Sequence, residues 1–186
     1  KVKYYPCGEE MFADMLEDLR KAEHYIFLEY FIVSEGKMWD TILEILKEKA
    51  ASGVEVRMIY DDMGCVTRLP GGYSEWLEKA GIRCMAFNPV IPFFSLVMNN
   101  RDHRKILADE YINEIVRFGY WKDTGVRLHG EGVWSFTVMF LEMWNAFRKE
   151  DEDIDRFRPH VWHPEAFAGA GLVQPYTDSP LDNETI

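Results

Sequence analysis

Hydrophobic residues recur along the first third of this chain with a spacing that switches between helix and strand. Apolar residues three and four apart predict a helix over 11–19, and a β-rich run with the pattern of a buried strand follows over 24–33. A second helical stripe covers 39–50, and Gly53 ends it before a strand over 54–60. This order is a β-α-β unit, which favours parallel strands covered by helices.

The alternation continues through the middle of the chain. A short helix over 73–80 leads into a third strand over 82–87, which the Asn88-Pro89 pair ends. Further on, a short strand over 125–128 precedes a helix over 133–147, whose density of apolar residues predicts burial. We therefore predict an α/β fold with a mixed, largely parallel sheet flanked by helices.

The character of the chain changes near residue 150. Residues 149–155 are mostly charged, and four prolines with several glycines follow. Such a composition is typical of an extended segment that has no core of its own. We predict one domain over 1–150 and a linker that begins at 151 and runs toward 186.

Composition agrees with one sizeable core, because 47% of the 186 residues are hydrophobic and 15% are aromatic. The longest apolar runs, 25–33 and 90–98, are shorter than the roughly 20 residues that a membrane span needs, so we expect the chain to be soluble. The formal net charge is −11 and no cluster of Lys and Arg interrupts it, which argues against binding to nucleic acid.

Three cysteines, Cys7, Cys65 and Cys84, are odd in number and lack the spacing of metal ligands. They predict reduced thiols in a cytoplasmic compartment. We assign no residue to a metal or cofactor.

The strongest chemical signal is His103-Arg104-Lys105, within a short run that reads as a strand. Alternation along a strand places the imidazole of His103 and the ammonium of Lys105 on one face. A histidine that can attack phosphorus, beside a lysine that can neutralise phosphoryl oxygens, is a minimal unit for cleaving a phosphodiester. A His-x-Lys pattern by itself is weak, because three-residue patterns recur by chance.

Several segments in the same order as in a known family make the pattern more specific. The chain resembles the first half of bacterial cardiolipin synthases, members of the phospholipase D superfamily. The resemblance implies a phospholipase D-like domain over 1–150, with 151–186 as the linker and the start of a second such domain. The segments that carry it are Phe27-Leu28-Glu29-Tyr30-Phe31-Ile32, Gly53-Val54-Glu55-Val56-Arg57, Tyr60-Asp61-Asp62, Phe87-Asn88-Pro89, Asn100-Arg101-Asp102-His103-Arg104-Lys105, Tyr120-Trp121-Lys122-Asp123-Thr124 and Phe140-Leu141-Glu142-Met143-Trp144-Asn145.

The resemblance implies a reaction. One histidine of the family attacks the phosphodiester of phosphatidylglycerol, and a second histidine protonates the leaving glycerol and later deprotonates the acceptor. His103 would be one of the two, and Lys105 would supply positive charge to the phosphoryl oxygens without a metal. The acceptor would be a second phosphatidylglycerol, and the enzyme would work at the cytoplasmic face of the bacterial membrane. A hydrolase that uses water as the acceptor is the alternative.

A histidine that attacks phosphorus needs a partner for its other ring nitrogen, and a carboxylate is the usual one. Glu29 is the candidate, because an acidic residue inside an apolar strand is costly to bury unless it is paired. The alternative is that Glu29 points into solvent from an edge strand.

Four further residues are candidates for substrate binding or support. Asn100 and Arg101 could contact phosphate, although turn chemistry explains Asn100 equally well. Trp121 and Asp123 lie in a segment that resembles the family, or they could only anchor the start of a strand.

The chain departs from the family after the His-x-Lys pair. The family signature continues to an Asp, a glycine-rich turn and an Asn, whereas here Asp109 comes one residue too early and no glycine follows before Gly119. We infer that about 15 residues, a strand and a turn by typical lengths, are absent between Leu107 and Ala108. Asp109 is therefore not given the role of the signature aspartate.

A single His-x-Lys unit cannot be both nucleophile and acid, so a second copy is required. It would come from a C-terminal phospholipase D-like half or from a second copy of the chain in a homodimer. The isolated chain is then expected to be inactive, or to be a domain that only binds phospholipid headgroups. The apolar stretch 90–98, just before the histidine, would meet the membrane surface or else cover the core.

Overall fold

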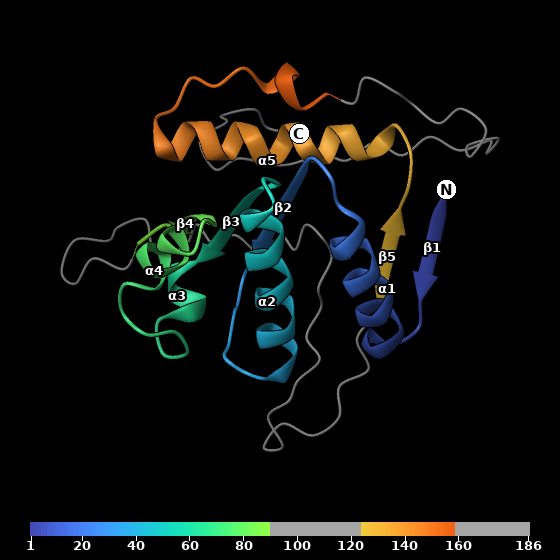
Figure 1. Ribbon diagram of the computed structural model, residues 1–186, viewed down its shortest axis with the longest axis horizontal. Coiled ribbons are helices and arrows are strands. Elements are labelled where there is room, and N and C mark those ends of the chain that lie inside the picture. Colours follow the sequence, from blue (N-terminus) through green and yellow to red (C-terminus); the bar gives the residue numbers. More distant parts are fainter. Residues whose placement is uncertain (90–123, 159–186) are drawn as a thin grey trace, which may run out of the picture.

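The computed structural model describes residues 1–89 and 124–158. In these two ranges it has a parallel three-stranded sheet, a separate two-stranded ribbon, and helices around both (Figure 1). The predicted α/β class, with a mixed and largely parallel set of strands, is confirmed.

The parallel sheet is built from β-α-β crossovers, as the periodicity predicts. β2 (Tyr25–Tyr30), β3 (Glu55–Asp61) and β4 (Arg83–Phe87) pair in that order. α2 (Lys37–Ala51) connects the first two strands, and α4 (Tyr73–Lys79) precedes the third. Such crossovers place helices on the faces of a sheet, so all three strands are largely buried.

One face of the sheet packs against α1 (Gly8–Lys21), α2 and α4. Side chains at alternate positions of each strand point into this core, as the period of two requires. The buried residues of this face and its helices include Met15, Leu19, Ile26, Leu28, Ile42, Leu46, Val56, Met58, Leu77 and Cys84.

The opposite face of the sheet packs against α5 (Gly132–Arg148), which runs across the top of Figure 1 from above β4 to above β5. The prediction that this helix is buried is correct for one side only. Val133 is 39% exposed and Phe147 52% exposed, because α5 lies on the surface and contacts the sheet along a single stripe. The buried cluster of this layer is Phe27, Ile59, Met85, Phe140, Leu141, Trp144 and Phe157.

The ribbon pairs β1 (Val2–Tyr5) with β5 (Gly125–Leu128) in antiparallel fashion. Lys3 and Arg127, opposite each other in the register, both form ion pairs with Asp14 of α1. Hydrogen bonds from Lys3 and Tyr5 lower the pKa of Asp14 to about 2. These contacts attach the ribbon to α1.

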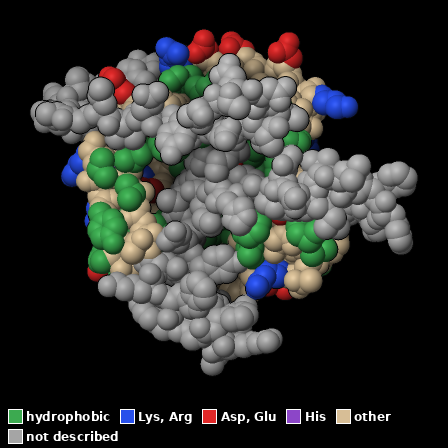
Figure 2. Space-filling view, turned by 180° about the vertical axis from the view of Figure 1, so that it is seen from behind, with side chains coloured by type: hydrophobic (Ala, Val, Ile, Leu, Met, Phe, Trp, Pro, Cys, Tyr) green, Lys and Arg blue, Asp and Glu red, His purple; other side chains and the backbone are tan. Residues whose placement is uncertain are grey.

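The other side of the ribbon is apolar and open. Val2, Tyr4 and Val126 are 57%, 62% and 47% exposed. Figure 2 views the molecule from behind and shows hydrophobic side chains at the left edge, the side on which β1 and β5 lie.

The structure differs from the sequence prediction at one strand end and in two short helices. β2 ends at Tyr30, earlier than the predicted strand over 24–33. α3 (Asp62–Cys65), which was not predicted, directly follows β3. A 3-10 helix, η2 (Ile154–Phe157), forms within the segment predicted as linker, and Phe157 is buried against the sheet. The division of the whole chain at residue 150 stays a prediction, but the described residues after it pack on the first domain.

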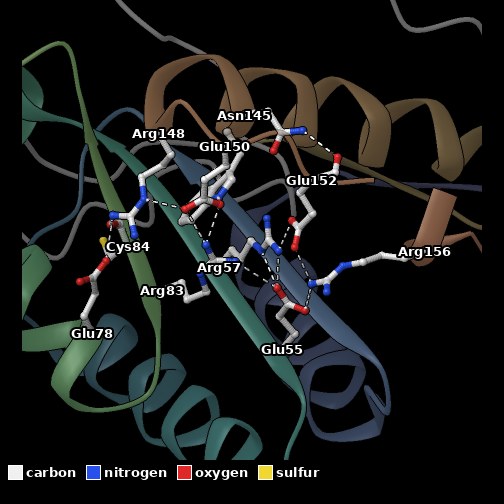
Figure 3. A network of polar contacts seen from close by, with 11 residues as sticks. Glu55, Arg57, Glu78, Arg83, Cys84, Asn145, Arg148, Glu150, Glu152 and Arg156 are labelled. Carbon is white, nitrogen blue, oxygen red and sulfur yellow. Dashed lines mark hydrogen bonds and ion pairs between the residues drawn. The ribbon is translucent and has the colours of Figure 1, made fainter. Parts of the chain in front are cut away.

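A network of charged residues joins α5 and η2 to the amino ends of the strands (Figure 3). The guanidinium of Arg57, with no exposed surface, forms ion pairs with Glu55 and Glu152. Its Cζ also lies 5.1 Å from the ring centroid of Trp144 and 5.0 Å from that of Phe157. Charges and aromatic faces together compensate for the loss of hydration.

Neighbouring arginines extend the network toward the end of α5. Arg83 binds the carboxylate of Glu150 at 2.7 and 2.8 Å, and Trp144 Nε1 donates to the same carboxylate at 3.0 Å. Arg148 reaches Glu78 of α4 at 2.9 Å. The polar groups under α5 thus connect it to two strands and a helix of the sheet layer.

Removing the central cation should be costly. We expect Arg57→Ala to lower the free energy of unfolding by about 3–5 kcal/mol, because it removes a fully buried side chain that two carboxylates and the rings of Phe27, Trp144 and Phe157 surround. Urea unfolding of the variant measures this. Arg20→Ala, at an exposed position of α1, is the control and should change stability by less than about 0.5 kcal/mol. Equal effects of the two variants would contradict the central role of Arg57.

Candidate functional site

Two acidic side chains lie at the carboxyl ends of the parallel strands. Glu29 of β2 and Asp61 of β3 both have no exposed surface. Glu29 aligns with Ile59, and Asp61 is two residues further along the same strand. The two carboxylates therefore lie on one face of the sheet as diagonal neighbours, with Cα atoms about 8 Å apart by the usual strand spacing and rise.

This is the same face that α5 covers at the amino end. Phe27 and Ile59, on that face, belong to the aromatic cluster, and the carboxylates begin where this cluster ends. The carboxyl edge of parallel strands is where α/β folds bind their ligands. Buried carboxylates at such an edge are candidates for a functional site.

The turn after β3 holds Asp61 in place. Asp61 caps α3, since its Oδ1 accepts a hydrogen bond of 2.9 Å from the backbone N–H of Gly64. A side-chain acceptor at this position is the usual N-cap device. The short helix therefore keeps the carboxylate at the end of its strand.

The same turn also fixes the segment that leaves β2. A Cβ at Gly64 would lie 2.2 Å from the carbonyl oxygen of Phe31, so only glycine permits this approach. The next residue, Cys65, accepts a hydrogen bond of 3.1 Å from the N–H of Val33 through its Sγ. The chain directly after Glu29 and the chain directly after Asp61 are thus held against each other.

The thiol of Cys65, at this turn, is not reactive. All three cysteines are free, and burial raises the pKa of Cys65 to about 11. A neutral, buried thiol is a poor nucleophile, so Cys65 has a packing role.

Glu29 is the one predicted site residue within the described part of the chain, and its role beside a histidine stays a prediction. The alternative that it points into solvent is wrong, because its side chain is fully buried. The other candidates, His103, Lys105, Asn100, Arg101, Trp121 and Asp123, lie outside the described residues, as does the apolar stretch 90–98.

Sequence reasoning missed Asp61 as a site residue. The sequence held a signal for it, because Asp61 is a polar residue at the end of an apolar strand. Alternation along that strand places Asp61 on the same face as Ile59. The register that brings it beside Glu29 required the structure.

Among the described residues, no group of three or more His, Cys, Asp or Glu side chains is arranged to hold a metal ion. Within the same residues, no helix is long and apolar enough to cross a membrane.

Comparison with known proteins finds relatives that are 35–49% identical to the chain. It is 49% identical over 201 positions to an uncharacterised protein of Streptococcus mutans. That alignment covers the whole chain and 43% of the Streptococcus mutans protein. It is 35% identical over 176 positions to a cardiolipin synthase of Staphylococcus aureus, with 86% of the chain and 36% of that protein covered. The chain is homologous to bacterial cardiolipin synthases. A cardiolipin synthase of Geobacillus thermodenitrificans is 38% identical over 74% of the chain and 30% of its own length.

These matches confirm the expected kinship with the cardiolipin synthases, although no family model matches the chain. The chain spans less than half of the length of these relatives. The alignment with the Streptococcus mutans protein runs over 201 positions, 15 more than the 186 residues of this chain. That such positions fall between Leu107 and Ala108 stays a prediction from the broken signature.

The close approach at Gly64 can be tested. We expect Gly64→Ala to destabilise the protein by about 1–3 kcal/mol, because the new methyl group meets backbone at Phe31 and the turn must shift. Thermal unfolding measures the effect. Gly71→Ala is the matched control, since a Cβ there has nothing within 4 Å. A Gly64→Ala protein as stable as the control would show that the two segments are not held this tightly.

Proposed function

We propose that this chain supplies one half of the active site of a cardiolipin synthase of the phospholipase D superfamily. The proposal is supported by the named relatives and, in the structure, by the fully buried Glu29 at the carboxyl end of β2. In the proposed reaction His103 is one of two histidines, and Glu29 orients its ring. A second His-x-Lys unit, from a C-terminal half or another copy of the chain, completes the site.

The proposed reaction has two steps. One histidine attacks the phosphorus of phosphatidylglycerol, the bond to glycerol breaks, and the other histidine gives its proton to the leaving glycerol. A hydroxyl of a second phosphatidylglycerol then attacks the phosphohistidine and returns a proton to that other histidine. Lys105 faces the phosphoryl oxygens in both steps. The products are cardiolipin and glycerol.

A carboxylate suits the orienting role for an electrostatic reason. A histidine with a carboxylate at one ring nitrogen keeps the other nitrogen directed at the substrate, and the negative charge raises the pKa of the imidazole. The carboxylate must be held rigidly for this purpose. Glu29 sits within a paired strand whose exit is fixed by Gly64 and Cys65.

A chimeric enzyme tests the assignment. The restored chain, which is this chain with the 15 additional aligned positions of the Streptococcus mutans relative inserted, replaces the aligned segment of the Staphylococcus aureus cardiolipin synthase. With phosphatidylglycerol vesicles we expect cardiolipin, and none from the same chimera carrying His103→Ala. The unmodified Staphylococcus aureus enzyme is the positive control.

Product analysis separates the alternatives. Phosphatidic acid without cardiolipin would favour the hydrolase. A folded chimera that forms neither product, beside an active control enzyme, would contradict the catalytic proposal and leave a domain that binds lipid only. The chimera made with the chain as it stands is expected to be inactive, because it lacks part of the signature.

The role of Glu29 has its own test in the active chimera. We expect Glu29→Gln to lower the rate of cardiolipin formation at least about tenfold, and to move the acid limb of the pH profile to lower pH, because removal of the negative charge lowers the pKa of the histidine. Glu44→Gln, on the exposed side of α2, is the matched control. A slower enzyme with an unchanged pH profile would mean that Glu29 acts on folding alone.

A further inference from the structure

A cavity of about 340 Å³ lies between the two sheets. Its walls come from α1, β2, β5 and the first half of α5, and α1, β5 and the start of α5 are seen at the right of Figure 1. Neither Glu29 nor Asp61 is among its described lining residues. The cavity is therefore separate from the proposed catalytic edge.

The walls of this cavity are mainly apolar. Met11, Met15 and Leu19 line it from α1, and Phe136 and Phe140 line it from α5. Water finds few hydrogen-bond partners on such walls, whereas an apolar molecule gains dispersion contacts. The flexible methionine side chains adjust to the shape of a ligand. The lining thus favours an apolar occupant.

The cavity is long rather than round. Along α1 its lining runs from Met11 to Ala22, a length of about 16 Å at the usual helical rise. Along α5 it runs from Val133 to Phe140, about 10 Å by the same measure. A cavity of about 150 Å³ takes the six carbons of benzene, so this one has room for about 12 to 14 carbons. A linear chain suits these dimensions.

The charges at the wall of the cavity are balanced. Asp18 and Arg127, which both line it, form an ion pair with each other. Arg127 also binds Asp14, and Asp14 binds Lys3. Two cations and two carboxylates therefore cancel, so an ionic headgroup would lose its hydration here without a matching gain. The charges favour an uncharged ligand.

Tyr25 and Thr137 place two hydroxyl groups in the wall of the cavity. Their oxygen atoms lie 3.4 Å apart, and either can donate. Thr137 Oγ1 also lies 3.3 Å from the carbonyl oxygen of Val133. Both distances are long for hydrogen bonds of a hydroxyl group, so these groups have capacity for a further partner. A ligand hydroxyl between them can accept from one and donate to the other.

We propose that this cavity binds one neutral single-chain lipid, a linear alkyl chain of about 12 carbons whose hydroxyl head reaches Tyr25 and Thr137. The tail lies between the methionines of α1 and the phenylalanines of α5. Each methylene group that enters the cavity increases the affinity about fourfold. The site does not depend on the proposed reaction, because it contains none of the proposed catalytic residues.

A series of straight-chain alcohols tests the proposal on the chain as it stands. From 1-hexanol to 1-dodecanol we expect the dissociation constant, measured by titration calorimetry, to fall about fourfold for each added carbon. 1-Dodecanol should bind at least as tightly as laurate, which has the same chain length and a charged head. The absence of saturable binding would overturn the proposal. Binding of laurate at least about tenfold tighter than that of 1-dodecanol would overturn it in favour of a site for anionic lipids.

A matched pair of variants tests whether the alcohols bind in this cavity. Ala22→Met adds a side chain at the cavity wall, and Ala13→Met adds the same side chain at an exposed position of α1. We expect Ala22→Met to weaken the binding of 1-decanol at least about tenfold, and Ala13→Met to change it less than about twofold. Equal affinities of the two variants would overturn the location.

A second variant tests the hydroxyl head and serves if Ala22→Met does not fold. Thr137→Val keeps the shape of the side chain and removes its hydroxyl group. We expect it to weaken the binding of 1-decanol about fivefold, because one hydrogen bond to the ligand is lost. An unchanged affinity would overturn the placement of the head beside Tyr25 and Thr137.

Discussion

The buried guanidinium of Arg57 is the interaction on which the packing of the second layer depends. α5 carries two buried aromatic side chains, Phe140 and Trp144, but it also lies over the charged amino ends of β3 and β4, which carry Glu55, Arg57 and Arg83. A charge without exposed surface is tolerated only when its partners surround it. Here the partners come from β3, from the segment after α5 and from aromatic rings on three elements, so the layer assembles as a unit.

The sheet face under α5 therefore has two chemically different ends. At the amino end, charges are matched in ion pairs whose role is to hold α5 and η2. At the carboxyl end of the same face, two buried carboxylates lie on adjacent strands beyond that network, and the turns that follow them are fixed to each other. Buried acidic groups at the ligand-binding edge of a parallel sheet are candidates for a functional site, which is why we assign function to this end of the sheet.

The two sheets raise a separate question of architecture. β2 is covered on both faces by helices, a situation typical of a strand inside a sheet, yet among the described residues it pairs on one side only. The helices on its two faces, together with pairing to β3, account for the burial of β2.

Sequence periodicity determined the order and type of the main elements, because amphipathic spacing is a local property. It predicted β5 with its observed bounds and placed the helix of α2 and its end before Gly53, whose φ of +93° is the left-handed conformation that glycine accepts. It also singled out Glu29 as a carboxylate within an apolar strand. What it could not determine was where β2 ends, since the close approach of Gly64 to Phe31 joins residues 33 positions apart.

The tertiary structure alone decided the rest. The role of Arg57, the packing of Phe157 beyond the predicted domain end, and the place of Asp61 beside Glu29 all depend on contacts between strands or between distant segments. Such contacts do not appear in the periodicity of the sequence, because the type of one residue does not determine which distant residue it will contact. The sequence specified which residues were chemically unusual, and the register of parallel strands decided which of them share a site.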